Sequence, residues 1–177
     1  MPHRRVRLVA DGPVLRQGFA AIRTELNVPA DFPPEVLAAA ATAAAHPHLP
    51  DASAKTPDRT DVAFLTIDPP GSMDLDQAMH IARTPTGYRV LYAIADVAAF
   101  VTPGDPIDVE AHVRGETLYS PDMRTPLHPP VLGEGAASLL PDQTRPALLW
   151  TIDLDAEGHQ TGVDVARAMV ASRSRLD

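Results

Sequence analysis

The sequence of 177 residues contains no cysteine and no long apolar run. The absence of cysteine excludes disulfides, thiolate metal sites and a cysteine nucleophile, so carboxylate, imidazole and hydroxyl groups must supply any chemistry. The first residues show neither the apolar segment of a secretory signal nor a membrane span. We therefore expect a cytoplasmic protein that does not bind membranes.

Basic residues are also scarce, because 15 Lys and Arg stand against 23 Asp and Glu, and the formal net charge is −8. Sequence-independent attraction to nucleic acid arises when Lys and Arg release counterions from phosphates, and the whole chain lacks the charge for it. If nucleic acid is the ligand, either the acid is concentrated at a metal site or the basic groove lies elsewhere. The length suits one domain, or one domain with a small leader.

Residues 1–57 are predicted to form a helical leader that ends in a linker. Apolar residues at spacings of four, three and four predict an amphipathic helix over 13–26; they are Leu15, Phe19, Ile22 and Leu26. A second, alanine-rich helix is expected over 35–45, with Asp31 as its cap. That helix has almost no side chains able to reach a base edge, so we expect no binding to DNA. The segment 46–59, rich in Pro, Ala, Asp and Thr, predicts the linker.

The pattern changes near residue 58, where an α+β fold is predicted to begin. Short apolar and β-branched stretches predict strands over 62–67, 78–82 and 88–95, followed by a helix over 106–113 with Asp105 as its cap. A strand with one buried face is predicted from the alternation of Leu148, Trp150, Ile152 and Leu154, and a turn joins it to a returning strand over 162–171. We expect a mixed β-sheet with flanking helices, and a final hairpin whose partner strands are missing or come from another chain.

Three carboxylates lie within nine residues, in a loop between two predicted strands. Asp68 closes the first strand and a Pro-Pro-Gly bend follows; Asp74 and Asp76, two residues apart, point to the same side of an extended segment. The loop can direct all three carboxylates to one point, where they repel one another unless a cation lies between them. Oxygen ligands favour magnesium or manganese, which serve phosphoryl chemistry. The alternative is a solvated turn, since Asp is common in turns for its own backbone hydrogen bonds.

Several segments, in this order and spacing, resemble successive signatures of the RNB family of exoribonucleases, the ribonuclease II and ribonuclease R type. They are Thr66-Ile-Asp68, Asp74-Leu-Asp76, Tyr92-Ala-Ile-Ala-Asp96, Arg114-Gly-Glu-Thr-Leu-Tyr119, Ser138-Leu-Leu-Pro141, Arg145-Pro-Ala-Leu and Ser172-Arg-Ser-Arg-Leu176. The resemblance covers residues 58–177. It implies the N-terminal portion of an RNB catalytic domain, truncated because the family's domain continues for about as long again.

The resemblance implies magnesium-dependent 3′-to-5′ hydrolysis of single-stranded RNA to 5′-nucleoside monophosphates. It assigns metal binding to Asp68, Asp74 and Asp76, with Asp76 most directly tied to catalysis. The fourth position of the family's acidic loop is Gln77 here, whose amide oxygen can coordinate a metal but brings no negative charge, so the ion should bind less tightly. Tyr119 matches the aromatic that packs on the 3′ nucleotide, with core packing as its alternative role.

The other polar candidates are expected to be structural or stay open. Asp96 is expected to brace the sheet, and His80 and His128 are expected to be structural. Four arginines could contact phosphate or form structural pairs, and the sequence does not distinguish these roles; they are Arg114, Arg145, Arg173 and Arg175.

The alternative function is a non-catalytic RNA-binding or regulatory remnant of such an enzyme. Gln77 favours it, as does the absence of the second half of the domain, which in the family supplies a catalytic arginine and the rest of the RNA channel. We therefore expect the 177 residues alone not to degrade RNA at a rate typical of the family. A weaker alternative is that the resemblance marks shared architecture and the acids form a solvated turn.

Overall fold

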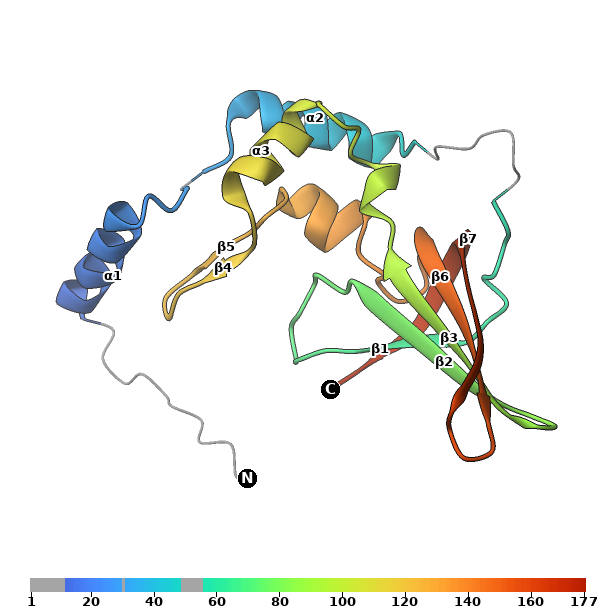
Figure 1. Ribbon diagram of the computed structural model, residues 1–177. Coiled ribbons are helices and arrows are strands. Elements are labelled where there is room, and N and C mark those ends of the chain that lie inside the picture. Colours follow the sequence, from blue (N-terminus) through green and yellow to red (C-terminus); the bar gives the residue numbers. More distant parts are fainter. Residues whose placement is uncertain (1–11, 30, 49–55) are drawn as a thin grey trace.

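The structure is a computed structural model that describes residues 12–29, 31–48 and 56–177. Five strands close into a narrow barrel, while a helical layer lies beyond one end of it and α1 lies farther out, beside the β4–β5 hairpin (Figure 1). The barrel strands are β1 (Phe64–Ile67), β2 (Gln77–Thr84), β3 (Gly87–Ala95), β6 (Thr144–Asp155) and β7 (Gln160–Leu176). The predicted α+β class with a mixed sheet is confirmed.

The barrel closes because its first and last strands pair in parallel. The register runs from Phe64 opposite Ser172 to Ile67 opposite Leu176, and the other neighbouring strands pair antiparallel in the order β1-β2-β3-β6-β7. The expectation that the final hairpin lacks partner strands is therefore wrong. β6 pairs with β3, and the 17-residue β7 is long enough to pair first with β6 and then with β1.

The interior of this small barrel is filled by few and mostly small side chains. Four alanines, each at most 2% exposed, lie among larger apolar residues of the same core; they are Ala78, Ala93, Ala147 and Ala168. Phe64 is fully buried and Leu149 is 5% exposed in this core. A narrow barrel leaves room only for such a mixture of small and large inward residues.

The predicted buried face of β6 is the wrong one. Ala147 and Leu149 point into the barrel, whereas Trp150 lies on the outer surface and is 37% exposed. Because side chains alternate with a period of two, a strand whose two faces both carry apolar residues does not reveal its inner face, and the narrow interior accepts the smaller set. Trp150 pairs across the hairpin with Val165, which is 46% exposed, so this outer surface is apolar, as expected for a face without a covering layer.

The helical layer forms a second core next to the barrel. Its elements are α2 (Pro34–Ala45), η1 (Val97–Ala99), α3 (Pro106–Arg114) and the π-helical turn η2 (Leu132–Ala136). Ala40 of α2 packs with Phe100, Ile107 and Leu132 in this core. The leader helix α2 is thus built into the same layer as α3 and η2, while a domain boundary near residue 58 stays a prediction.

The two leader helices form where they are predicted, with differences in detail. In α1 (Pro13–Glu25) no residue is buried, although one of its faces is apolar. Asp31 does not cap α2, since the cap position is Pro33 and no side chain caps the helix. In α3, Asp105 is the predicted cap and accepts a 2.8 Å hydrogen bond from the backbone N–H of Asp108. Residues 49–55 of the predicted linker lie outside the described part of the chain.

In the described ranges no helix is both long enough and apolar enough to cross a membrane.

The barrel core predicts a large stability difference between inward and outward positions. Phe64→Ala should lower the free energy of unfolding by about 3–5 kcal/mol, because it empties a fully buried site. Ile81→Ala, at a position of β2 that is 56% exposed, should cost about 1 kcal/mol or less. Urea denaturation followed by tryptophan fluorescence measures both. Equal losses in the two variants would contradict this assignment of the core.

Candidate functional site

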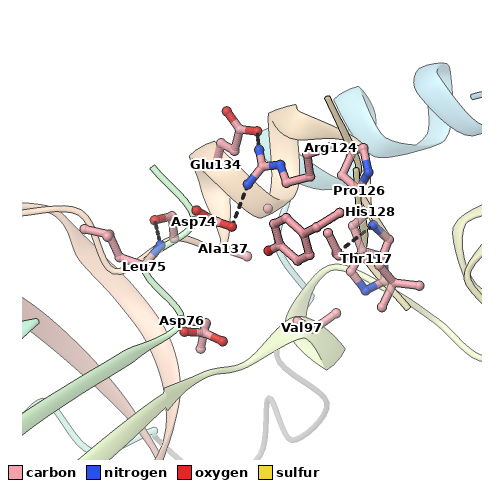
Figure 2. A pocket seen from close by; sticks show the side chains of 15 residues that line it. Asp74, Leu75, Asp76, Val97, Thr117, Arg124, Pro126, His128, Glu134 and Ala137 are labelled. Atoms are coloured by element: carbon pink, nitrogen blue, oxygen red, sulfur yellow. Dashed lines mark hydrogen bonds and ion pairs between the residues drawn. The ribbon is translucent and has the colours of Figure 1, made fainter. Parts of the chain in front are cut away.

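Two of the three aspartates in the acidic loop line one cavity of about 320 Å³ at the barrel end. The loop between β1 and β2 contributes Asp74 and Asp76, and the hairpin of β4 (Leu118–Tyr119) and β5 (Arg124–Thr125) contributes Tyr119 and Arg124. Glu134 comes from η2. Three segments far apart in the sequence therefore meet at this cavity, which Figure 2 shows from close by.

The loop is held by a buried leucine between the two aspartates. Leu75 is fully buried; its N–H donates to Ser138 Oγ at 3.0 Å and its carbonyl accepts from the N–H of Leu139 at 2.7 Å. Ser138 Oγ also donates to the carbonyl of Met73 at 2.6 Å. In an extended segment neighbouring side chains point to opposite sides, so a buried Leu75 favours Asp74 and Asp76 on the same side. Asp74 and Asp76 both line this cavity, as does Leu75, and the convergence of the carboxylates on one point stays a prediction.

Asp68 and Gln77 lie outside the cavity lining. Asp68 follows β1, and its backbone N–H donates to the carbonyl of Leu176 at 2.9 Å, so barrel closure fixes its position. The predicted bend after it is present, with Gly71 at a φ of 87°. Gln77 begins β2, and its Oε1 accepts a hydrogen bond from the hydroxyl of Tyr92. The amide oxygen that could bind a metal is engaged on the barrel surface.

The electrostatics of the loop favour a cation. The pKa of Asp76 is raised, chiefly because packing withdraws its carboxyl from water, and further because Asp68 and Asp74 repel its charge; a backbone hydrogen bond opposes the shift. Asp68 is thus close enough to act on Asp76. Repulsion of this kind is relieved by a hard cation, and the donor oxygens are those that Mg²⁺ and Mn²⁺ prefer. Within the described residues, however, no three acidic or histidine side chains are already drawn together as a metal cage.

A guanidinium that sequence reasoning missed lies against the acids. Arg124 Nη1 is 2.6 Å from Asp74 Oδ2, and its Nη2 donates to the carboxylate of Glu134 (Figure 2). Neither Arg124 nor Glu134 belongs to a recognisable motif, and 50 residues separate Arg124 from Asp74. Only the hairpin and η2 bring them to the loop, so no signal in the sequence could have found them.

Tyr119 is not a core residue, because 74% of it is exposed, and it lines the cavity. The hairpin that carries it is anchored by the leader: Arg23 of α1 forms two hydrogen bonds with the Asp122 carboxylate, at 2.7 and 3.1 Å, and one with Ser120 Oγ at 3.1 Å. This pairing lowers the pKa of Asp122. Tyr119 also borders a second, apolar cavity of about 310 Å³ between α1 and the hairpin. One role of the leader is therefore to position Tyr119.

Asp96 has the structural position that was expected. It is 2% exposed, its Oδ2 is 2.7 Å from Arg167 Nε of β7, and its N–H donates to the carbonyl of Pro146 at 3.1 Å. These contacts join the end of β3 to two other strands.

The four arginines left open by the sequence all make structural contacts. Arg114 is buried, where it pairs with Glu110 at 2.8 Å, donates to the carbonyl of Asp31 at 3.0 Å, and lies 3.6 Å from the ring of Phe32. The other three donate to backbone carbonyls: Arg145 to Ser138 and Gly135, Arg173 to Thr60, and Arg175 to Ser72. Arg175 thereby ties the end of β7 to the acidic loop.

The two histidines differ in position. His80 Nδ1 lies 3.0 Å from the carbonyl of Ala63, which fits the structural role expected of it. His128 lines the cavity, its Nδ1 has no hydrogen-bond partner among the described residues, and burial lowers its pKa. Burial thus favours the neutral form of this imidazole in the cavity wall.

Comparison with known proteins identifies the family of the chain. The sequence profile of the family described as RNB domain matches residues 57–177. The chain belongs to the RNB family. It is 34% identical over 119 residues to ribonuclease R of Acidithiobacillus ferrooxidans, covering 67% of this chain and 27% of that protein. It is 35% identical over 129 residues to exoribonuclease 2 of Vibrio parahaemolyticus, covering 71% of this chain and 19% of that protein.

A solved structure extends the likeness to the leader. Mycoplasma genitalium RNase R in complex with ribose methylated single-stranded RNA superposes with a TM-score of 0.81 at 28% identity, covering 94% of this chain and 26% of that chain. The coverage exceeds the region matched by the family profile, so α1 or α2 is shared as well. This RNB chain spans about a quarter or less of the length of these relatives.

The hydrogen bond between the Leu75 N–H and Ser138 Oγ predicts a specific effect of Ser138→Ala. The change leaves the buried N–H of Leu75 without an acceptor and should lower the free energy of unfolding by about 1–3 kcal/mol, while hydrogen exchange at the Leu75 amide accelerates. Ser120→Ala is the matched control, because this serine also makes side-chain hydrogen bonds but lies where water can replace them. An unchanged rate of hydrogen exchange at the Leu75 amide in Ser138→Ala would show that the hydrogen bond to Ser138 does not hold the loop.

Proposed function

We propose that this chain carries the metal-binding part of a magnesium-dependent 3′-to-5′ exoribonuclease that converts single-stranded RNA to 5′-nucleoside monophosphates. The observation that supports this most directly is the pair Asp74 and Asp76, which the buried Leu75 turns into one cavity together with the exposed Tyr119. Ribonucleases of the family to which the chain belongs, ribonuclease R and exoribonuclease 2, support the reaction class.

Asp68, Asp74 and Asp76 are the residues that would hold Mg²⁺, or Mn²⁺ in its place. Bound there, the ion supplies polarisation of the scissile phosphate and activation of a water. Withdrawal from water, together with repulsion by Asp68 and Asp74, raises the pKa of Asp76, so a nearby cation would favour its ionised form. We assign Asp76 the most direct role in catalysis.

Tyr119 is suited to stack on the base at the 3′ end of RNA. Its ring borders the cavity that Asp74 and Asp76 also line, and it is 74% exposed. Stacking on an aromatic face tolerates every base, which fits an enzyme that removes nucleotides one after another. The net charge of −8 opposes attraction to the rest of the RNA, so these 177 residues would supply few of the contacts with its phosphate backbone.

A second candidate is RNA binding without catalysis. It is favoured by Gln77, which brings no charge to the loop and whose amide oxygen accepts a hydrogen bond from Tyr92 outside the cavity. In this case the loop would bind its metal weakly, and Tyr119 would contact RNA that is not cut. Metal affinity and hydrolysis distinguish the two.

The role of Asp76 is tested by Asp76→Asn in the 177-residue chain and in a full-length protein that carries it. Calorimetric titration should show that the variant binds Mg²⁺ at least tenfold more weakly than the parent, a loss of about 1.4 kcal/mol or more, because a charged ligand is lost.

In the full-length protein, release of nucleoside monophosphates from 3′-hydroxyl single-stranded RNA should stop while RNA binding persists. The 177 residues alone should release them many orders of magnitude more slowly, since positioning by the rest of the channel is a large part of catalysis. Equal activity in Asp76→Asn and the parent would remove Asp76 from the mechanism.

The contribution of Gln77 is tested by Gln77→Asp. The added charge should tighten Mg²⁺ binding, and the aspartate side chain, one methylene shorter than that of Gln77, reaches less far toward the Tyr92 hydroxyl. Tyr92→Phe is the control, because it frees the amide without adding charge. Tighter binding in Gln77→Asp and little change in Tyr92→Phe are expected; no gain in Gln77→Asp would mean that the fourth position does not reach the ion.

A further inference from the structure

Arg124 has an unusual position for a cation in an acidic metal site. Its guanidinium bridges two carboxylates, Asp74 at 2.6 Å and Glu134, and the side chains of all three are 30% to 40% exposed. Figure 2 shows Asp74 turned toward Arg124, while Asp76 lies apart from this network. The acid pair that lines the cavity is thus divided, with Asp74 neutralised from within the protein and Asp76 not.

The charges around the cavity explain why this matters. Its lining includes three carboxylates, those of Asp74, Asp76 and Glu134, and Arg124 is its one arginine or lysine within the described residues. The nearby Arg145 and Arg175 already donate to backbone carbonyls and lie outside this lining. Arg124 is therefore the side chain of this chain best able to meet a phosphate at the cavity.

We propose that Arg124 is a positioning residue that exchanges partners: it pairs with Asp74 in the metal-free site, and it pairs with the phosphate of the RNA once a metal ion has taken Asp74. This inference rests on the proposed metal-dependent function. Asp74 cannot give the same carboxylate oxygen fully to a guanidinium and to an ion, so the two cations compete. A phosphate that draws Arg124 away also makes Asp74 available to the metal.

The geometry suits such an exchange. The Arg124 and Asp74 side chains are 30% and 40% exposed, and ion pairs that water reaches contribute little to stability, so separating the two costs little. The guanidinium carries its donors in a fixed fork that matches phosphate oxygens. Glu134 binds a different nitrogen from Asp74, Nη2 instead of Nη1, so it can keep Arg124 at the cavity while Nη1 changes partner.

The experiment measures Mn²⁺ and 5′-adenosine monophosphate as probes, by calorimetry on the full 177-residue chain. Arg124→Gln should bind Mn²⁺ at least about fivefold more tightly than the parent chain, which lies in the range usual for coupling between two binding sites. In the background of Asp74→Asn the same change should give no gain, because the competition acts through Asp74. With Mn²⁺ present, Arg124→Gln should bind the nucleotide about tenfold more weakly, as expected for the loss of a charged hydrogen bond.

Two further variants make the outcome decisive. Arg124→Met removes the charge but keeps the aliphatic stem, and it should change both affinities as Arg124→Gln does. If one of the two variants does not fold, the other still gives the test. Arg89→Gln is the matched control: Arg89 makes a two-bond pair with Asp153 at 2.7 and 2.9 Å and does not line the cavity, so both affinities should stay unchanged.

The failures of the inference and of the proposed function are distinct. Equal Mn²⁺ affinity with and without Arg124 would show that Arg124 and the metal do not compete for Asp74, even where the metal binds well. A gain that persists in the Asp74→Asn background overturns the assignment to Asp74, and nucleotide binding that ignores Arg124 overturns its contact with phosphate. If no variant binds Mn²⁺, the inference and the proposed metal site fall together.

Discussion

The burial of Leu75 is the constraint on which the candidate site depends. This residue fills a fully buried position, and the backbone on both sides of it is bonded to Ser138 and Leu139. With that one side chain buried, the alternation of an extended chain favours the same side for Asp74 and Asp76, and both line the cavity. The carboxylates of a loop held in this way repel one another, and a bound cation would relieve that repulsion.

Closure of the barrel supplies the third acid. Asp68 follows β1, and the parallel pairing of β1 with β7 fixes the chain there through the bond from Asp68 N–H to the carbonyl of Leu176. The same end of β7 reaches the loop through Arg175 and the carbonyl of Ser72. The last strand thus positions residues more than 100 places earlier in the sequence, and the acids depend on the whole barrel.

Arginine in this chain serves mainly as a structural donor. Buried or half-buried guanidinium groups donate to carbonyls and carboxylates, and these contacts join the leader, the helical layer and the strands. Arg114 of α3, for example, pairs with Glu110 and contacts both Asp31 and Phe32. Arg23 connects α1 to the hairpin of Tyr119 in the same way. These cations are engaged elsewhere, and among the described residues the cavity lining contains three carboxylates and one guanidinium.

The sequence by itself determined the elements and the acidic loop, because these depend on local properties. Periodicity predicts α1, α2 and α3, the Pro-Pro-Gly bend is a local turn, and Asp74 and Asp76, two residues apart, line the same cavity. The order of short motifs was also enough to identify the family. Each of these signals needs no knowledge of what lies across the fold.

Only the tertiary structure decided which faces are buried and which residues meet. Both faces of β6 are apolar, and the narrow interior that admits Ala147 instead of Trp150 exists only once five strands have closed. The exposure of Tyr119 follows from a hairpin whose anchor, Arg23, lies about a hundred residues away. Arg124 reaches Asp74 across 50 residues of chain and also binds Glu134, and the first contact leaves no mark in the sequence because it depends on packing and not on spacing.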